Sequence, residues 1–199
     1  GAPRLRSRAL SAAKATLGAF ELTVRDVFGT LELCALEVAI SMSLDSAFQY
    51  AAQLEDPIRA DLVEAHRRSW ARLAGSGTWW TGPERIAIAA ASRAAIDCAL
   101  CRERKEALSA FSATGAHDGV SGGDSEGVIP EAAIDAVHRI VTDASRLSGT
   151  WIEGLAEQGV SDAHYVELLS VVVSVRSIDA FHRAMGLPLE PLPEPTLGG

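Results

Sequence analysis

The chain lacks several features that would point to particular classes of protein. It has only three cysteines among 199 residues, too few for the disulfide framework of a small secreted protein. No apolar run approaches the roughly 20 residues that cross a bilayer as a helix. Asp and Glu outnumber Lys and Arg by 26 to 18, so the basic face that binds a nucleic-acid backbone is not expected. We predict a cytoplasmic protein that binds neither nucleic acid nor membrane.

What is present is typical of one helical domain. Apolar residues make up 48% of the chain, enough to bury a core in a protein of this length. They recur at helical spacing through most of the sequence. We predict a single all-α domain over residues 1–199, with residues 1–75 as a helical extension and residues 79–195 as the core.

The first part of the extension is predicted to form a helix over residues 5–17 and, over residues 23–53, one long helix or two helices joined near Gly29. Cys34 lies on the apolar stripe of residues 23–53. A lone cysteine in that position is usually a small buried apolar residue, so we interpret Cys34 as part of the core.

A further helix is predicted to begin at Asp56-Pro57 and to end near Leu73, because Asp caps helices well and Pro is favoured at the first helical position. His66 within it is flanked in sequence by charged residues. We interpret His66 as a solvent-facing residue without a functional role.

Residues 81–111 form the stretch around which we expect the other helices to pack. Thr81 and Glu84 have the spacing of a capping box, in which each side chain caps the backbone of the other. An alanine-rich apolar run without Gly or Pro follows, which predicts a helix that its neighbours can approach closely.

Two of the three cysteines stand in this stretch as a C-x-x-C motif, at Cys98 and Cys101. This spacing brings the sulfur atoms within reach of each other across one helical turn. A helix break at Asp97 would place Cys98 at a new helix start, where unpaired N–H groups lower a thiol pKa. An unbroken helix would remove that effect.

The Gly-rich segment 112–127 is predicted to be a long loop, either functional or merely exposed. Its His117-Asp118 pair could serve chemistry or form a solvated turn. The helix predicted to begin at Pro130 carries His138 beside its apolar side, as an active-site base or as a histidine at the edge of the core.

The C-terminal part is predicted to hold a short helix over residues 151–158 and a long one over residues 162–185, which is apolar all round. Such a helix is buried in a core or between subunits. The Pro-rich tail after Gly186 could cover its own core or a neighbouring subunit. We predict a homo-oligomer formed through this helix and tail.

The C-x-x-C after an alanine-rich run, together with the closing stretch 159–191, resembles the AhpD-like/carboxymuconolactone decarboxylase family, in its peroxidase-related branch. The resemblance covers roughly Trp79 to Pro195, and the two cysteines are its specific part. It implies an AhpD-like helical bundle with extra N-terminal helices, a homo-oligomer, and an antioxidant function in which peroxide is reduced through a disulfide cycle.

The motif of that branch has a Glu about a dozen residues before the C-x-x-C and a His four residues beyond its second Cys. Cys98 and Cys101 match it. Lys105 stands at the position where the motif has its His, and Glu84 lies two residues upstream of the position where the motif has its Glu. The dithiol is therefore present, whereas its proton relay has to come from elsewhere.

The residues predicted to be catalytic are Cys98, Cys101, Glu84 and His138. His117 and Glu167 are further candidates for the missing relay. One thiolate would attack a hydroperoxide, the other would form the disulfide, and an unidentified thiol reductant would restore the dithiol. A helix start favours Cys98 as the attacking residue, but the resemblance favours Cys101, and we follow the resemblance.

Two other functional classes are compatible with the sequence. The family that the sequence resembles also includes decarboxylases without redox chemistry, so a non-redox decarboxylase-like enzyme is one alternative. An oligomeric small-molecule-binding protein is the other. A zinc site would need two ligands besides Cys98 and Cys101, and no second C-x-x-C or paired His follows. We therefore expect neither a metal nor a cofactor.

Overall fold

The structure, a computed structural model, describes residues 47–109, 111–118 and 128–196. Every regular element in these ranges is helical, and none of them is a strand, so the predicted all-α fold is confirmed. The helices predicted over residues 5–17 and over most of 23–53, with Cys34, lie outside the described residues. The helices run in the order α2 (Ala60–Ala74), α3 (Gly82–Ala94), α4 (Ala99–Glu106), α5 (Glu131–Asp143), α6 (Gly149–Glu157) and α7 (Asp162–Ala184), with short 3-10 helices at Tyr50–Ala52 and Ala144–Arg146.

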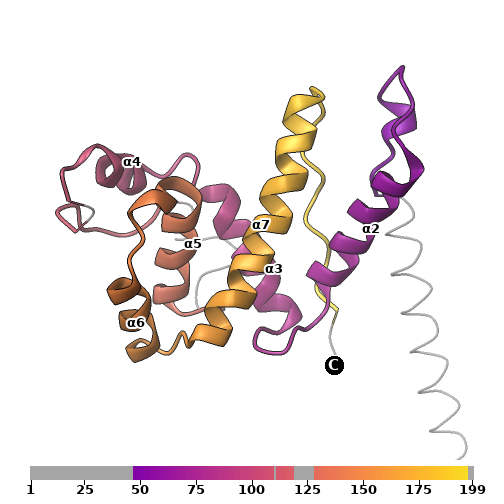
Figure 1. The fold of residues 1–199 in the computed structure, drawn as a ribbon. Coiled ribbons are helices and arrows are strands. Elements are labelled where there is room, and N and C mark those ends of the chain that lie inside the picture. Colours follow the sequence, from indigo (N-terminus) through magenta and orange to yellow (C-terminus); the bar gives the residue numbers. More distant parts are fainter. Residues whose placement is uncertain (1–46, 110, 119–127, 197–199) are drawn as a thin grey trace, which may run out of the picture. The chain divides into compact units, whose positions relative to one another are not determined.

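Helix α3 lies at the centre of the compact unit that begins at Ala47, where it packs against α2, α5 and α7 (Figure 1). Its buried side chains are mostly small, including Ala87, Ala89 and Ala91, so neighbouring helices can approach its backbone closely. Helix α5 packs against α7 and also carries α4. The C-x-x-C helix is therefore held on the core by α5.

The starts of α3 and α7 follow the sequence signals. Thr81 and Glu84 form the predicted capping box at the start of α3, and Ser161 caps α7. Helix α3 ends at Ala94 and α4 begins at Ala99, so of the two alternatives, a break near Asp97 and an unbroken helix, the structure has the break. The N-cap of α4, however, is Cys98 itself.

The predicted helix boundaries before α2 were wrong. Residues 47–49 are not helical, because Phe48 has a positive φ of 56° that an α-helix does not allow. Its ring is buried against Tyr50 and Trp70, so packing holds this backbone conformation. Helix α2 begins at Ala60 rather than at Pro57, because its first backbone hydrogen bonds go to the carbonyl of Arg59.

His66 is buried, so its interpretation as a solvent-facing residue was wrong. Charged sequence neighbours were a poor guide, because residues three and four positions apart share a helix face. On that face His66 is followed by Trp70 and Leu73, both buried. Its Nδ1 lies 2.7 Å from the Tyr50 hydroxyl, which also lies 2.9 Å from Nε2 of His182.

We expect His66 to make folding sensitive to acid. Burial, and then the neighbouring His182, lowers the pKa of His66 from its ordinary value of 6.5. Between those two pKa values the unfolded chain binds a proton that the folded chain does not, so the free energy of unfolding falls as the pH falls through this range. His66→Gln, which cannot titrate, should flatten the dependence of Tm on pH between about pH 7.5 and about pH 5.5.

The comparison with the parent protein isolates the contribution of this side chain, because the two proteins differ at no other residue. Equal slopes of Tm against pH in the two proteins would contradict the prediction. Thermal unfolding followed by circular dichroism at closely spaced pH values is sufficient.

The Pro-rich tail covers its own core, which is one of the two predicted alternatives. The indole N–H of Trp70 donates to the Pro191 carbonyl at 2.8 Å, and the Thr196 N–H donates to the Ala74 carbonyl at 2.9 Å. The chain reverses after α7 at Gly186, whose φ of 69° favours glycine. The tail consequently runs between α7 and α2 (Figure 1).

Helix α7 buries one side and exposes another. Leu168, Val171 and Val175 are buried, whereas Val166 and Val173 are exposed. No helix among the described residues is both long enough and apolar enough to span a bilayer. A homo-oligomer formed through α7 stays a prediction.

Candidate functional site

The candidate site begins at the start of α4, where the two cysteines lie close together. Cys98 is the N-cap and Cys101 lies in the first turn, and both are buried free thiols. The backbone of Cys98 is extended, with φ −64° and ψ 122°. A sulfur at a helix N-terminus faces unpaired N–H groups, which favour its thiolate form.

The segment after α4 folds back onto this helix start. The Asp118 carboxylate accepts a hydrogen bond from the Ala99 N–H at 2.7 Å. The Asp118 N–H in turn donates to Cys98 Sγ at 3.4 Å. Asp118 thus caps α4 in place of a side chain from the N-cap, and it places the preceding residue, His117, over the sulfurs.

Two histidines converge on the cysteines. His117 Nδ1 lies 3.6 Å from Cys98 Sγ and 3.6 Å from Cys101 Sγ. His138 Nδ1, from α5, lies 3.3 Å from Cys101 Sγ. The four sulfur and nitrogen atoms all lie within 4.8 Å of one another, and all four residues are buried.

Asp135, on α5, orients the His117 ring. Its Oδ1 lies 3.0 Å from His117 Nε2, and both Arg104 and Arg139 pair with the same carboxylate. Because a carboxylate that holds two arginines is an acceptor, His117 Nε2 carries a hydrogen. In the neutral ring, the lone pair of Nδ1 then faces both sulfurs.

The surroundings shift the pKa of His117 and of Asp135 in opposite directions. Burial alone lowers the pKa of His117, but hydrogen bonds to Asp135, Cys101 and Cys98 outweigh burial and raise this pKa to about 10. Burial alone raises the pKa of Asp135, but hydrogen bonds to His117 and the two arginines hold it well below its usual range. His117 and Asp135 therefore form an imidazolium–carboxylate pair next to the two thiols.

The pKa values of Cys98 and His138 also differ from their ordinary values. Burial raises the pKa of the Cys98 thiol, but hydrogen bonds from the Cys101 N–H, His117 and the Asp118 N–H outweigh burial and lower it. Burial, followed by the positive charge of His117, lowers the pKa of His138 to about 4. Cys98 is thus favoured as a thiolate, and His138 as a neutral ring.

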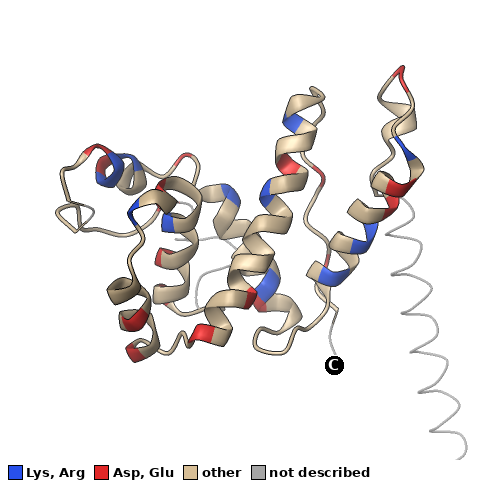
Figure 2. Cartoon of the chain, in the orientation of Figure 1, with Lys and Arg blue, Asp and Glu red and all other residues tan. Residues whose placement is uncertain are grey.

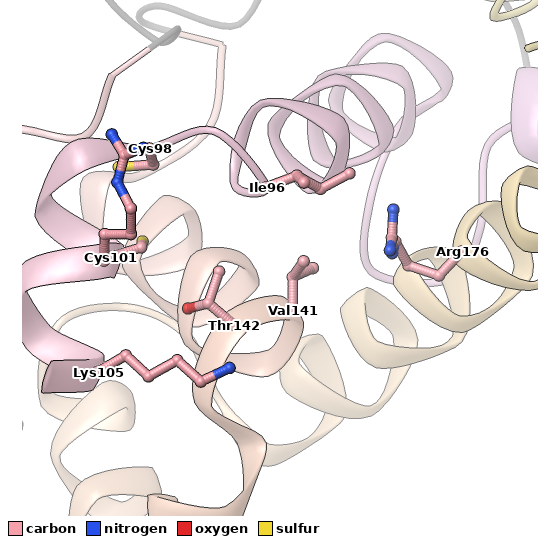
Figure 3. Close-up of a pocket in the computed structure, with 8 residues that line it drawn as sticks. Ile96, Cys98, Cys101, Lys105, Val141, Thr142 and Arg176 are labelled. Carbon is pink, nitrogen blue, oxygen red and sulfur yellow. The ribbon is translucent and has the colours of Figure 1, made fainter.

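A pocket of about 250 Å³ opens onto both sulfurs. Three of its lining residues are cationic: Arg102 and Lys105 from α4, and Arg176 from α7. Helix α4 carries Lys and Arg as well as Glu (Figure 2). Figure 3 shows the cysteines at one end of the pocket and Arg176 at the other. Nη1 of Arg176 is buried and has no hydrogen-bond partner among the described residues, so the pocket is suited to an anion.

The structure brings Cys98, Cys101 and His138 together, but it places Glu84 elsewhere. The Glu84 carboxylate accepts hydrogen bonds from the N–H and hydroxyl of Thr81, at the far end of α3 from the cysteines. Glu167, another relay candidate, pairs with Arg85 at 2.7 Å. Of the candidates for the relay, His117 and His138 are the two that contact the sulfurs.

Sequence reasoning missed Asp135 and Arg104. The signal for Asp135 was its position three residues before His138 and four before Arg139 on one helix, which places all three on one face. Arg104 similarly follows Cys101 by three residues. The role of Asp118 carried no sequence signal, because it depends on how the loop folds back.

The arrangement supports two kinds of chemistry. A thiolate beside an oriented imidazole can act as a nucleophile, and two adjacent thiols can form a disulfide. Two thiolates and two imidazoles are also ligands that a metal ion can use. Comparisons with protein-family models, with curated proteins and with solved structures find no match to this chain, so the interpretation of the site depends on its own geometry.

Proposed function

We propose that the protein is a thiol-dependent peroxidase that reduces a small hydroperoxide through a dithiol–disulfide cycle of Cys98 and Cys101. The observation that carries the proposal is the position of His117, 3.6 Å from both sulfurs and hydrogen-bonded to Asp135. The imidazole of His117 can therefore exchange protons with the reacting groups at both sulfurs in turn. The chemistry is that of the family which the sequence resembles, with His117 in place of the histidine that Lys105 replaces.

In the first step the Cys98 thiolate attacks the outer oxygen of the hydroperoxide. A sulfur–oxygen bond forms, the O–O bond breaks, and Cys98 becomes a sulfenic acid. The departing alkoxide takes a proton from His117 and leaves as an alcohol. We assign the attack to Cys98 rather than to Cys101, which the resemblance favours, because Cys98 is the N-cap of α4 and its sulfur accepts the Asp118 N–H at 3.4 Å.

In the second step the Cys101 thiolate attacks the sulfenic sulfur. A disulfide forms and hydroxide leaves, taking a proton to become water. His117 lies equally close to Cys101, so it can accept the thiol proton of this residue and pass it on. Two electrons from an external dithiol then restore both cysteines.

The cationic pocket indicates the class of substrate. Arg102, Lys105 and Arg176 surround the approach to the sulfurs, and the buried Nη1 of Arg176 has no partner among the described residues. A hydroperoxide that also carries a carboxylate would pair with this guanidinium. We therefore infer an anionic organic hydroperoxide as the preferred substrate.

The test is to count thiols and measure the mass of the reduced, metal-free protein before and after one equivalent of hydroperoxide. Loss of both thiols and of the mass of two hydrogen atoms is expected. Cys101→Ser should stop at a sulfenic acid on Cys98, whereas Cys98→Ser should react far more slowly. Cumene hydroperoxide and a carboxylate-bearing hydroperoxide of similar size should be compared, the second reacting faster.

Cys34→Ser serves as the matched control, because it removes the third cysteine of the chain and leaves both cysteines of the motif. It should react like the parent protein. Thiols that survive either hydroperoxide for many minutes would overturn the proposal. A sulfenic acid trapped on Cys101 in Cys98→Ser, at the parental rate, would reverse the order of the two cysteines.

A further inference from the structure

We propose that the reduced site binds one Zn²⁺ ion through Cys98 Sγ, Cys101 Sγ, His117 Nδ1 and His138 Nδ1. The inference goes beyond the peroxidase function and does not depend on it. It stands on the convergence of four donor atoms from three parts of the chain: α4, the segment after it, and α5.

Three of the distances between the donor atoms are close to those of a tetrahedral site. Zinc binds sulfur at about 2.3 Å and imidazole nitrogen at about 2.0 Å, so neighbouring S and N ligands lie roughly 3.6 Å apart. Three of the four S···N distances in the structure are 3.6, 3.6 and 3.3 Å, and no two of the four donor atoms lie more than 4.8 Å apart. A central ion therefore requires the four donor atoms to move closer together only where their distances exceed this value, by at most about 1 Å.

The surroundings of His117 and Cys98 resemble those of metal ligands. His117 presents Nδ1 to the site and donates from Nε2 to Asp135, which fixes the ring and increases the basicity of the ligating nitrogen. Cys98 Sγ accepts the Asp118 N–H, which stabilises a thiolate. Arg104 and Arg139 in turn hold Asp135 in place.

The donor set selects zinc among common ions. Two thiolates and two imidazoles in a tetrahedral arrangement suit Zn²⁺, whereas Mg²⁺ and Ca²⁺ require oxygen ligands. Two thiolates also neutralise the charge of the ion, which matters because all four ligands are buried. Four protein ligands leave no open coordination position, so the ion would close the site rather than activate water.

Occupation by zinc has a consequence for the thiols. A sulfur bound to zinc is a poorer nucleophile than a free thiolate, and it is held apart from the other sulfur. Zinc would thus keep the reduced site unreactive, and removal of zinc would expose the dithiol. The ion would also tie the segment with His117 to α4 and α5.

The experiment is a titration of the reduced, metal-free full chain with Zn²⁺ under anaerobic conditions, with zinc measured by atomic emission after gel filtration. One ion per chain is expected, together with a higher Tm. Co²⁺ reports the ligands directly, because sulfur-to-cobalt charge transfer and intense d–d bands indicate thiolates in a tetrahedral site. These readouts need no enzymatic activity.

Variants test which residues are ligands. His138→Gln and Cys101→Ser should lose tight binding and change the Co²⁺ spectrum. Asp135→Asn should weaken binding by roughly 10- to 100-fold, as expected for a partner of a ligating histidine. His164→Gln is the matched control, because His164 bonds to Ser161 at the start of α7, away from the cysteines. It should bind zinc as the parent does.

The proposal is overturned if the parent protein retains less than a stoichiometric amount of zinc, or if its Co²⁺ spectrum lacks sulfur charge transfer. Should a variant fail to fold, the Co²⁺ spectrum of the parent protein still decides. The two proposals can fail separately. Zinc binding with inert thiols in the metal-free protein would refute the peroxidase alone, and reactive thiols without zinc binding would refute the metal site alone.

Discussion

Replacing His117 by Ala is expected to slow the reaction of the metal-free protein with hydroperoxide by roughly 10²-fold or more, the usual contribution of a positioned acid or base. His117 Nδ1 lies 3.6 Å from each sulfur and is the group that can give a proton to the departing alkoxide. Without it, the alkoxide must take its proton from water, and Cys98 loses one hydrogen bond that stabilises its thiolate. Stopped-flow measurement of thiol loss gives the rate.

Two further variants separate chemistry from folding. Asp135→Asn keeps the shape of the side chain and leaves His117 in place, so a smaller loss of rate is expected. His164→Ala, outside the site, should leave the rate unchanged. A His117→Ala protein with a native circular-dichroism spectrum and the parental rate would contradict the role given to His117.

The regular helices were predictable because their signals are local. The capping box of Thr81 and Glu84 and the Ser161 cap both appear where the sequence predicts them. The break before the C-x-x-C was one of the two alternatives that the same local reasoning left open, and Cys98 rather than Asp97 is the cap. Local hydrogen bonds between residues a few positions apart decide such features.

The completed site was not predictable, because it depends on contacts between distant residues. His117 stands in a Gly-rich segment that carries no periodic pattern, and it reaches the sulfurs through the contacts of Asp118 with the start of α4. His138 could equally have been a core histidine. The proposed zinc ligands could for this reason not be predicted from the sequence, in which His117 and His138 do not form a closely spaced pair of histidines.

The same limitation applies to Glu84. Its spacing to the C-x-x-C suggested a catalytic role, and its spacing to Thr81 suggested a cap. The structure shows the hydrogen bonds of the cap. A helix of this length separates its two ends, so a residue in the first turn of α3 and a cysteine after its last turn have different neighbours.

Breaking the ion pair between Arg93 and Asp179 is expected to have the largest effect on stability. The Asp179 side chain is 1% exposed, and Arg93 binds it through two hydrogen bonds of 2.7 and 3.0 Å. Arg93 also donates to the Glu190 carbonyl of the tail at 2.8 Å. Arg93→Met would leave a buried carboxylate without its partner, so the free energy of unfolding should fall by about 3–5 kcal/mol.

Urea unfolding monitored by circular dichroism measures this loss, and a fall in Tm on the order of 10 °C should accompany it. The double variant Arg93→Met/Asp179→Leu should recover most of the loss, because an apolar pair in a buried position needs no compensation of charge. Arg68→Met is the matched control. Its ion pair with Glu64 is exposed, so the loss should stay below about 1 kcal/mol. If Arg93→Met cost no more than Arg68→Met, the ion pair would not be what holds α3, α7 and the tail together.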